Sequence, residues 1–487
     1  MRTIIINRQR RILVAFALAS VAGSLPGFAA THDYAISVDA AMQRLTVVAR
    51  FSGPVTEVRA DSEYARQFLE HASACTADEE LRARGRRLRL PGDGLQCLRY
   101  EVDLQAAARV SRTRTLLDPA NIVVSPTLWM WRPRLYRDDE IRVRFELPDG
   151  VDVSVPWKPL HTGDYDYAFG PSPRSGDAIA VFGDFESTTE RVAGVDLRIT
   201  VLRSGNDTDL PALIDWVRAT AENVALAYGR FPNPDARVVL IPVGSSPWGG
   251  NSAIPFGRVV RDGGETIEIL INERRPIREY YEEWTPTHEF SHLMLPYLGR
   301  EQRWVSEGFA TYYQNVLLAR AGQYTEREAW EKLVAGLERG RNSAPNLSPN
   351  EAASDGIRDA RMKIYWSGVS LALMADVELR RRSRGAESLD TVLGRLAHCC
   401  LPSDHRWSGP ELFRKLDTLL DEPLFMDLYR RYADTPGFPD ATPLLAKLGV
   451  TDARGRVRLS DTAEFAAIRR ALTGPHAHRD RPVSAAH

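Results

Sequence analysis

The chain has 487 residues with a formal net charge of −1, and 44% of its residues are hydrophobic. A chain of this length can form two or three domains with substantial cores. Because 63 basic residues face 64 acidic ones, the surface lacks the positive field that nucleic-acid binding requires, and we expect no nucleic-acid partner.

The N-terminal segment has the pattern of an export signal. An apolar core over residues 12–22 precedes a small-x-small cleavage site at Gly27-Phe28-Ala29. The basic residues before this core are Arg2, Arg8, Arg10 and Arg11. The apolar core is short for a membrane span, and no later stretch is long enough, although an uncleaved anchor is the alternative. We therefore expect a signal peptide over residues 1–29, a periplasmic or secreted product, and no stable membrane insertion after its removal.

Residues 31–202 are predicted to form a β-rich domain. Segments 34–38 and 45–51 alternate apolar and polar residues or carry β-branched ones, as strands do. Segments 141–147 and 151–155, separated by a Pro-Asp-Gly turn, predict a β-hairpin whose alternate residues face a core. We expect this domain to be an antiparallel β-sandwich.

Aromatic residues and cysteines of this domain support the same expectation. Trp129, Trp131 and Trp157 are predicted to be core residues, with a sugar-binding platform as the alternative. Cys75 and Cys97 are predicted to form a disulfide, which would stabilise the fold by about 3 kcal/mol. For the adjacent pair Cys399 and Cys400, free thiols and a redox-labile bond both remain open.

Residues 203–323 mix helical and strand patterns. An apolar stripe predicts a helix over residues 210–228, and short buried strands are expected at 238–243 and 267–271. Thr285 and Pro286 are suited to begin a further helix. Residues 324–474 are predicted to be helical, including helices at 326–339 and 365–382, and residues 475–487 to be a disordered tail.

The sequence His288-Glu289-Phe290-Ser291-His292 is the most specific motif in the chain. Histidines four apart on a helix project from one face, so both imidazoles can bind the same metal ion. Glu289 lies round the helix, where its carboxylate can act as a base on a metal-activated water. The alternative is a helix end with two solvated histidines.

A third ligand is expected at Glu307. Catalytic zinc takes three protein ligands and keeps one position open for water. Glu307 lies in the first turn of a predicted buried helix, and a loop around Pro296 and Gly299 can bring that helix against the histidines. An acidic residue near a helix start also has an ordinary explanation in the helix dipole. We predict one Zn²⁺ bound by His288, His292 and Glu307.

HEFSH followed by WVSEGFATYY resembles the gluzincin metallopeptidases, in particular the aminopeptidase N and glycyl aminopeptidase families. The resemblance spans about residues 224–374 and implies a thermolysin-like zinc catalytic domain. It also assigns Tyr365, in Tyr365-Trp366-Ser367-Gly368, the role of stabilising the tetrahedral intermediate, with a core aromatic as the alternative. The overall expectation is a multidomain α+β protein: the β-sandwich, the zinc domain and the C-terminal helical region that completes the active site.

The stretch Gly249-Gly250-Asn251-Ser252 falls where the resembled enzymes place a strand along the substrate. We therefore predict Gly249, Gly250 and Asn251 as substrate-binding residues, with an ordinary turn as the alternative. Aminopeptidase N carries a glutamate there that binds the free amine of the substrate, and this chain has none. The nearest acidic residues in the sequence are Asp262 and Glu265.

These observations predict an exported zinc-dependent peptidase, aminopeptidase-like, that hydrolyses peptide bonds through a zinc-bound water with Glu289 as the base and Tyr365 as the oxyanion donor. Its expected partner is a peptide or protein substrate. Two alternatives are a zinc endopeptidase acting on an envelope protein and a non-catalytic zinc-binding assembly module.

Overall fold

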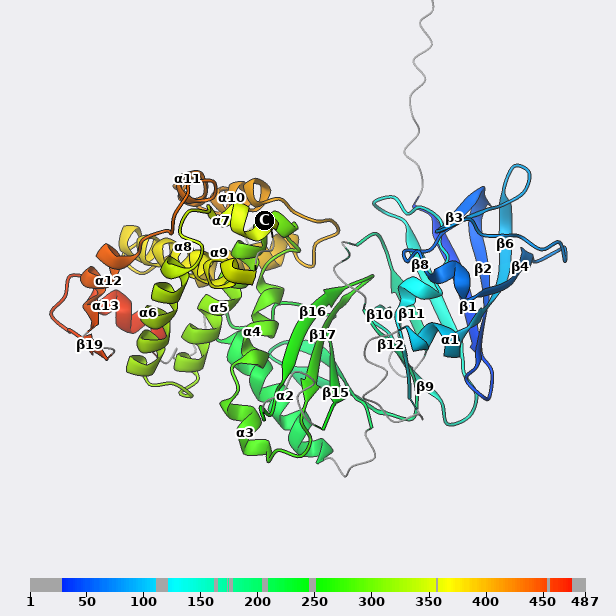
Figure 1. Cartoon of the computed structure of the whole chain (residues 1–487), viewed down its shortest axis with the longest axis horizontal. Coiled ribbons are helices and arrows are strands. Elements are labelled where there is room, and N and C mark those ends of the chain that lie inside the picture. The colour runs from blue at the N-terminus through cyan, green and yellow to red at the C-terminus, as the bar shows by residue number, and fades with distance from the viewer. Residues whose placement is uncertain are drawn as a thin grey trace, which may run out of the picture.

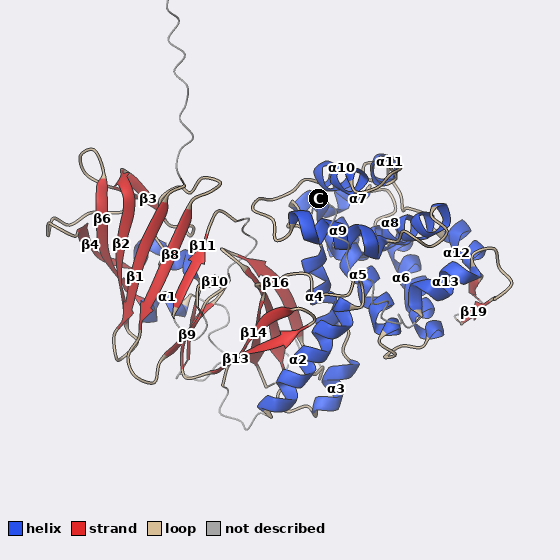
Figure 2. Cartoon of the chain, turned by 180° about the vertical axis from the view of Figure 1, so that it is seen from behind, coloured by secondary structure: helices blue, strands red, loops and turns tan. Residues whose placement is uncertain are grey.

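The computed structural model describes residues 29–110, 121–161, 165–172, 174, 178–203, 209–244, 251–355, 358–452 and 456–474. The predicted signal segment up to residue 28 and the predicted tail from residue 475 lie outside these residues. The chain forms a β-rich N-terminal lobe and a second lobe in which a sheet is followed by helices (Figures 1 and 2). The mixed α+β, multidomain architecture expected from the sequence is confirmed.

The N-terminal lobe is built on a seven-stranded sheet of order β10-β11-β8-β1-β2-β6-β4. Its strands are β1 Thr31–Val38, β2 Arg44–Val55, β4 Leu69–Ala74, β6 Leu95–Asp103, β8 Glu140–Glu146, β10 Lys158–Pro159 and β11 Asp166–Phe169. All neighbours run antiparallel except β1 and β8, which are parallel, so the sheet is mixed and not purely antiparallel as predicted. In β8, Ile141, Val143 and Phe145 are buried and the arginines between them are exposed, which confirms the predicted alternation.

A three-stranded sheet, β7-β12-β9, shares a core with the larger sheet. Its strands are β7 Asn121–Val124, β9 Asp152–Ser154 and β12 Ala180–Gly183. The predicted hairpin between 141–147 and 151–155 is wrong, because β9 pairs with β12 and not with β8. Both edges of β8 are already taken by β1 and β11, so the chain that follows it must join another sheet.

The shared core of this lobe is aromatic. Trp129, Trp131 and Trp157 are each at most 1% exposed, which confirms them as core residues and excludes a sugar platform there. Trp129 meets Trp157 edge to face at 5.9 Å, and Trp157 stacks on Phe169 at 4.7 Å. The small pair β3 Glu57–Arg59 and β5 Arg87–Arg89 and the helix α1 Leu104–Arg109 complete the lobe.

The second lobe opens with a five-stranded sheet of order β13-β14-β15-β17-β16. Its strands are β13 Glu186–Val192, β14 Val195–Val201, β15 Arg237–Pro242, β16 Phe256–Arg261 and β17 Glu265–Ile271. β14, β15 and β17 are parallel, and β16 closes one edge in the antiparallel direction. The predicted domain boundary at residue 202 falls inside this sheet, since β14 before it pairs with β15 after it.

Both faces of this sheet are covered, which explains why β15 is apolar throughout. Val238 and Leu240 pack on the helical side, whereas Val239 and Ile241 pack against Val181 and neighbouring residues of the N-terminal lobe. Buried Arg237 donates to Ser154 Oγ and to the Ile179 carbonyl, so the contact between the lobes is polar as well as apolar.

Helices cover the other face of the sheet and continue to the C-terminal region (Figure 1). They are α2 Leu210–Ala225, α3 Ile277–Glu282, α4 Thr285–Ser291, α5 Arg303–Arg320, α6 Glu326–Asn342, α7 Pro349–Asp355, α8 Arg361–Arg382, α9 Leu389–Cys400, α10 Gly409–Thr418, α11 Phe425–Tyr432, α12 Thr442–Leu448 and α13 Ala466–Thr473. A short pair, β18 Val450–Asp452 and β19 Val457–Leu459, lies between the last two helices. None of the helices in the described part of the chain has the length and apolarity that a membrane span needs.

Disulfides join Cys75 to Cys97 and Cys399 to Cys400. The first bridges β6 to the segment that follows β4, as predicted, with the two Cα atoms 5.4 Å apart. For the adjacent cysteines, where free thiols and a bond were both open, the structure has the bond.

Candidate active site

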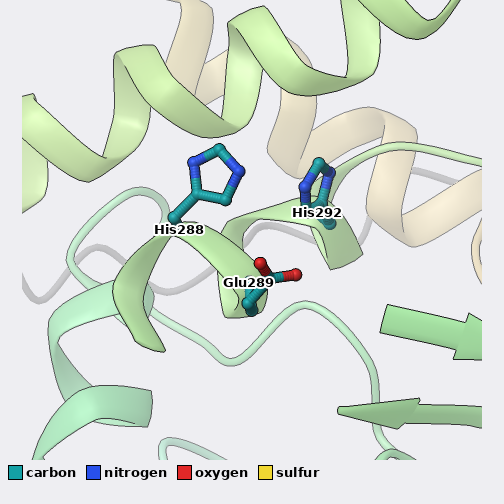
Figure 3. A group of neighbouring side chains, drawn as sticks. All are labelled: His288, Glu289 and His292. Atoms are coloured by element: carbon teal, nitrogen blue, oxygen red, sulfur yellow. The ribbon is translucent and has the colours of Figure 1, made fainter. Parts of the chain in front are cut away.

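The two histidines of the motif lie on α4. The helix begins at Thr285, with Trp284 as its N-cap and Pro286 in its first turn, one residue away from the predicted start. His288 and His292 project to the same side of the helix, and the Glu289 carboxylate lies between them in Figure 3. One donor atom from each of the three residues lies within 4.8 Å of the others. The predicted grouping is therefore present.

Glu307 reaches both histidines from the second turn of α5, one turn later than predicted, because the helix already begins at Arg303. Its Oε2 lies 3.3 Å from His288 Nε2 and 3.6 Å from His292 Nε2. The side chain of Glu307 is only 13% exposed. Two imidazole nitrogens and one carboxylate oxygen thus converge on one point, although 19 residues separate His288 from Glu307 in the chain.

The other ring nitrogen of each histidine has a partner on α5. Ser306 Oγ lies 3.1 Å from His292 Nδ1, and Thr311 Oγ1 lies 3.5 Å from His288 Nδ1. Such contacts orient a ligating imidazole and fix which nitrogen faces the metal. The Nε2 atoms are therefore the ones available as ligands.

The donors fit a zinc ion. A tetrahedral zinc site with bonds of 2.0–2.1 Å separates its ligand atoms by about 3.3 Å. The spacings of Glu307 Oε2 from the two Nε2 atoms, 3.3 and 3.6 Å, are close to that value. Two imidazoles and one carboxylate are also a common ligand set of catalytic zinc, with a fourth position left for water.

Two glycines bring Tyr365 to the site by letting α5 and α8 touch through their backbones. A Cβ added to Gly308 would lie 2.2 Å from Gly368 Cα, and one added to Gly368 would lie 2.1 Å from the Trp304 carbonyl oxygen. The close approach sets Tyr365, one turn before Gly368, against the zinc ligands. Its ring stacks on His288 at 5.9 Å, and its hydroxyl lies close enough to Glu307 and Arg303 for their charges to act on it.

Strand β16 packs against the side of α4 that carries Glu289. A Cβ at Gly257 would lie 2.6 Å from Glu289 Cγ, so only glycine lets this edge strand pack against Glu289. At the far end of the strand, Arg261 Nη2 donates to the His292 carbonyl at 3.4 Å. β16 is the outermost of the described strands of its sheet on this side.

Burial and charge shift the carboxylates in opposite directions. Burial raises the pKa of Glu289 above its ordinary value, against the opposing effect of His292 and His288. Burial acts in the same direction on Glu307, but hydrogen bonds from His288 and His292 outweigh it and hold the Glu307 pKa well below its usual range. Burial also raises the pKa of Tyr365, so its hydroxyl stays protonated as a donor. The pattern gives an ionised ligand, Glu307, beside a carboxylate, Glu289, that holds a proton more readily than an exposed one does.

The structure thus brings together His288, Glu289, His292, Glu307 and Tyr365, but it does not bring Asn251 to a strand. Asn251 is exposed in a loop five residues before β16, and Gly249 and Gly250 lie outside the described residues. Among the described residues, the strand beside Glu289 is β16. The glycine inside the strand pattern at Gly257 was the sequence signal that could have identified it.

Neither acidic residue nearest to this stretch in the sequence is presented to a substrate amine. Glu265 is buried between Arg261 and Asn233, and Asp262 is 7% exposed at the turn into β17. That turn packs on the N-terminal lobe, since a Cβ at Gly263 would meet the Trp157 ring at 2.5 Å. Asp262 also lies five positions along β16 from Gly257, which corresponds to about 16 Å.

Sequence reasoning also missed Arg303, the first residue of α5. Its Nε donates to Glu307 Oε1 at 3.1 Å, while 55% of its side chain remains exposed. An arginine one turn before a predicted metal ligand was the available signal.

Comparison with known proteins agrees with this geometry. The family described as M61 glycyl aminopeptidase matches residues 297–368, a stretch that contains Glu307, Gly308, Tyr365 and Gly368. No significant match is found among curated protein sequences.

A solved structure shares the fold over most of this chain. An aminopeptidase N family protein from Idiomarina loihiensis superposes with a TM-score of 0.62 at 13% identity, covering 86% of this chain and 78% of that one. An M1 zinc metallopeptidase from Deinococcus radiodurans gives a TM-score of 0.48 at 14% identity, covering 84% and 94% of the two chains. The resemblance to gluzincin aminopeptidases is therefore confirmed, in sequence over the half of the site that carries Glu307 and Tyr365, and in fold over most of the chain.

Proposed function

We propose that the protein is an exported zinc-dependent peptidase of the aminopeptidase-like gluzincin type. The observation that carries the proposal is the convergence of His288 Nε2, His292 Nε2 and Glu307 Oε2 beside the Glu289 carboxylate and the Tyr365 hydroxyl. A zinc ion held by the first three residues supplies Lewis acidity toward water and the scissile carbonyl.

The chain's own residues supply the remaining chemistry. Glu289, with its raised pKa, accepts a proton from the attacking water and returns it to the leaving amine. The Tyr365 hydroxyl, kept protonated by burial, donates to the oxygen on which negative charge develops, an effect worth about 3 kcal/mol in the transition state. β16, which packs against Glu289 through Gly257, is the strand along which an extended peptide would lie.

Metal content and hydrolysis test this proposal together. The purified protein is expected to hold one zinc and to hydrolyse either amino-acid anilides or internally quenched peptides. Tyr365→Phe should lower turnover with little change in KM, because the contact exists only in the transition state. Equal turnover by Tyr365→Phe and wild type would make Tyr365 a core aromatic. Full zinc occupancy with hydrolysis of no peptide would favour the non-catalytic assembly module.

The position of the cleaved bond decides between the aminopeptidase and the endopeptidase. An aminopeptidase has to bind the free ammonium of its substrate, and burying an ammonium without a partner costs several kcal/mol. The carboxylates close to His288 and Tyr365 are Glu289 and Glu307. N-acetylation of a cleaved peptide tests the assignment: aminopeptidase activity predicts complete loss of hydrolysis. Unchanged hydrolysis would favour the endopeptidase.

Export is the part of the proposal that needs no substrate. The disulfide between Cys75 and Cys97 is typical of proteins from oxidising compartments. Peptide mapping without reduction of the protein from its native host should find these cysteines bonded and residues 1–29 absent. Alkylatable Cys75 and Cys97, or retention of residues 1–29, would contradict export with signal removal.

A further inference from the structure

Arg303 is unlike the structural arginines of this protein. Arg320 and Arg469 are 0% and 1% exposed along their side chains, and each is surrounded by acceptors, including Asp390 and Asp461 respectively. Arg303 is 55% exposed although it contacts two groups of the candidate active site. Its guanidinium therefore lies at the site and remains accessible to solvent.

The contacts of Arg303 leave donors free. Its Nε donates to Glu307 Oε1, the carboxylate oxygen that faces away from the histidines, and the side chain also lies close to the Tyr365 hydroxyl. A guanidinium has five N–H groups in a planar fork, which matches a carboxylate in two parallel hydrogen bonds. The exposed part of this fork can accept such a ligand without breaking the bond to Glu307.

The charge balance of the site favours an anion in this position. With a divalent cation bound, the carboxylates of Glu289 and Glu307 would neutralise it. Arg303 then adds a positive charge whose ion-pair partner among the described residues is Glu307 itself. Its contact with Tyr365 means that a carboxylate bound there lies close to the carbonyl under attack. The group bound is then part of the substrate residues that flank the scissile bond.

We propose that Arg303 is a specificity-determining residue that binds a substrate carboxylate next to the scissile bond. The substrate class is a peptide with either a C-terminal carboxylate or an acidic side chain at this position. The inference rests on the proposed peptidase function and names the substrate of that same site. A competing explanation is that Arg303 only positions Glu307, as partners of metal ligands commonly do.

Peptide binding to the zinc-loaded Glu289→Gln protein separates these explanations, because peptides bind there without being turned over. Calorimetry compares two matched pairs of one cleaved peptide: a free against an amidated C-terminus, and Asp against Asn beside the scissile bond with the C-terminus amidated. We expect the acidic member of one pair to bind about tenfold more tightly, as for a charged hydrogen-bonded pair. The pair that shows the difference identifies the source of the carboxylate.

Arg303→Gln in the same background should reduce binding of the acidic peptide to the level of the neutral one and leave the neutral peptide unchanged. Arg303→Lys should restore part of the preference, since it keeps the charge but not the fork. Arg300→Gln, which removes an exposed arginine three residues earlier, is the matched control and should keep the full preference. Zinc content is measured on each variant.

Equal affinity for acidic and neutral peptides, or an equal loss of both in Arg303→Gln, would overturn the proposal and make Arg303 a positioning residue for Glu307. Loss of zinc in Arg303→Gln with the acidic preference retained would do the same. If the wild type cleaves neutral peptides and shows no preference for acidic ones, only the role proposed for Arg303 is rejected. Failure of the zinc-loaded wild type to cleave peptides of either charge rejects the peptidase proposal itself.

Discussion

The N-terminal lobe and the helical region stabilise their interiors in different ways. The lobe encloses aromatic rings such as Trp129 and Trp157 and leaves its strand charges exposed, as in β8. The helical region instead buries two carboxylates and two guanidiniums behind the active site. A region that only has to fold can rely on apolar packing, whereas one that has to position polar groups needs polar contacts with defined directions.

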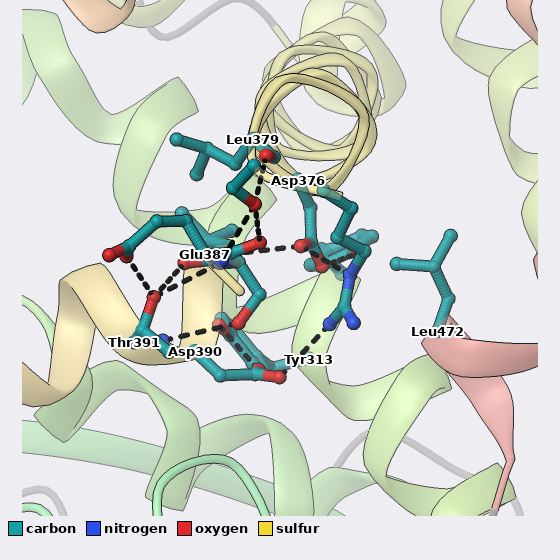
Figure 4. A network of polar contacts seen from close by, with 12 residues as sticks. Tyr313, Asp376, Leu379, Glu387, Asp390, Thr391 and Leu472 are labelled. Carbon is teal, nitrogen blue, oxygen red and sulfur yellow. Dashed lines mark hydrogen bonds and ion pairs between the residues drawn. The ribbon is translucent and has the colours of Figure 1, made fainter. Parts of the chain in front are cut away.

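The buried polar network joins four helices, including the two that carry Glu307 and Tyr365. Asp390 on α9 accepts from Arg320 of α5 at 3.0 Å and from Arg380 of α8 at 3.2 Å. Figure 4 shows Asp376, Asp390 and Tyr313 within the network. Arg320 also donates to the Leu472 carbonyl of α13, so α13 is hydrogen-bonded to α5, the helix that carries Glu307.

Asp390→Ala should have the largest effect in the helical region. It leaves Arg320, whose side chain is 0% exposed, without its carboxylate, and we expect a loss of about 3–5 kcal/mol in unfolding free energy. Because Arg320 is on α5, zinc retention and turnover should fall as well. Urea denaturation and metal analysis measure both. An unfolding midpoint equal to wild type would contradict a stabilising role for the network.

Trp129→Ala should have a similar effect on folding but not on the site. Removing this 0% exposed ring creates a cavity in the N-terminal core, with an expected cost of about 3–4 kcal/mol. The remaining folded protein should hold its zinc and keep wild-type turnover per folded molecule. A fall in turnover larger than the loss of folded protein would show that packing in the N-terminal lobe affects the active site.

Gly368→Ala sharpens the comparison at the contact between α5 and α8. The added methyl group would lie 2.1 Å from the Trp304 carbonyl oxygen, so the helices must separate. We expect about 1–3 kcal/mol of destabilisation and a fall in turnover, because Tyr365 moves with α8. Gly53→Ala in β2 is the control, since nothing lies within 4 Å of a Cβ there. Equal turnover of both variants would contradict this account of how Tyr365 is placed.

Glu378→Gln should have the smallest effect, although it removes two ion pairs from α8. Its partners Arg381 and Arg382 are 50% and 36% exposed, so water compensates for the lost contacts. The change in unfolding free energy should stay below about 1 kcal/mol. A loss as large as that of Asp390→Ala would mean that burial does not distinguish the two sets of charges.

Local patterns were sufficient to predict much of this protein. The alternation in residues 141–145 identified the buried face of β8, and the spacing of His288 and His292 placed both on one face of a helix. Glu307 was predicted because catalytic zinc needs a third ligand and few acidic residues were suitably placed. Each of these features depends on neighbours in the chain or on the chemistry of one ion.

Features that depend on distant partners were not predictable in the same way. The strand after the turn at Gly150 pairs with β12 because β8 has no free edge, which its own residues do not reveal. The strand β16 beside Glu289 was not predicted. The network around Asp390 joins residues up to 152 positions apart, and each of its charged members looks like an ordinary surface charge in the sequence.

Zinc content and turnover, measured together on Glu289→Gln and Glu307→Ala, test the central claim most directly. The account predicts that Glu289→Gln keeps wild-type zinc while hydrolysis falls about a thousandfold or more, because it removes a base and no ligand. Glu307→Ala should lose zinc under mild chelation, because only His288 and His292 remain to hold it. Full zinc in Glu307→Ala, or more than about a tenth of wild-type turnover in Glu289→Gln, would contradict the assigned roles.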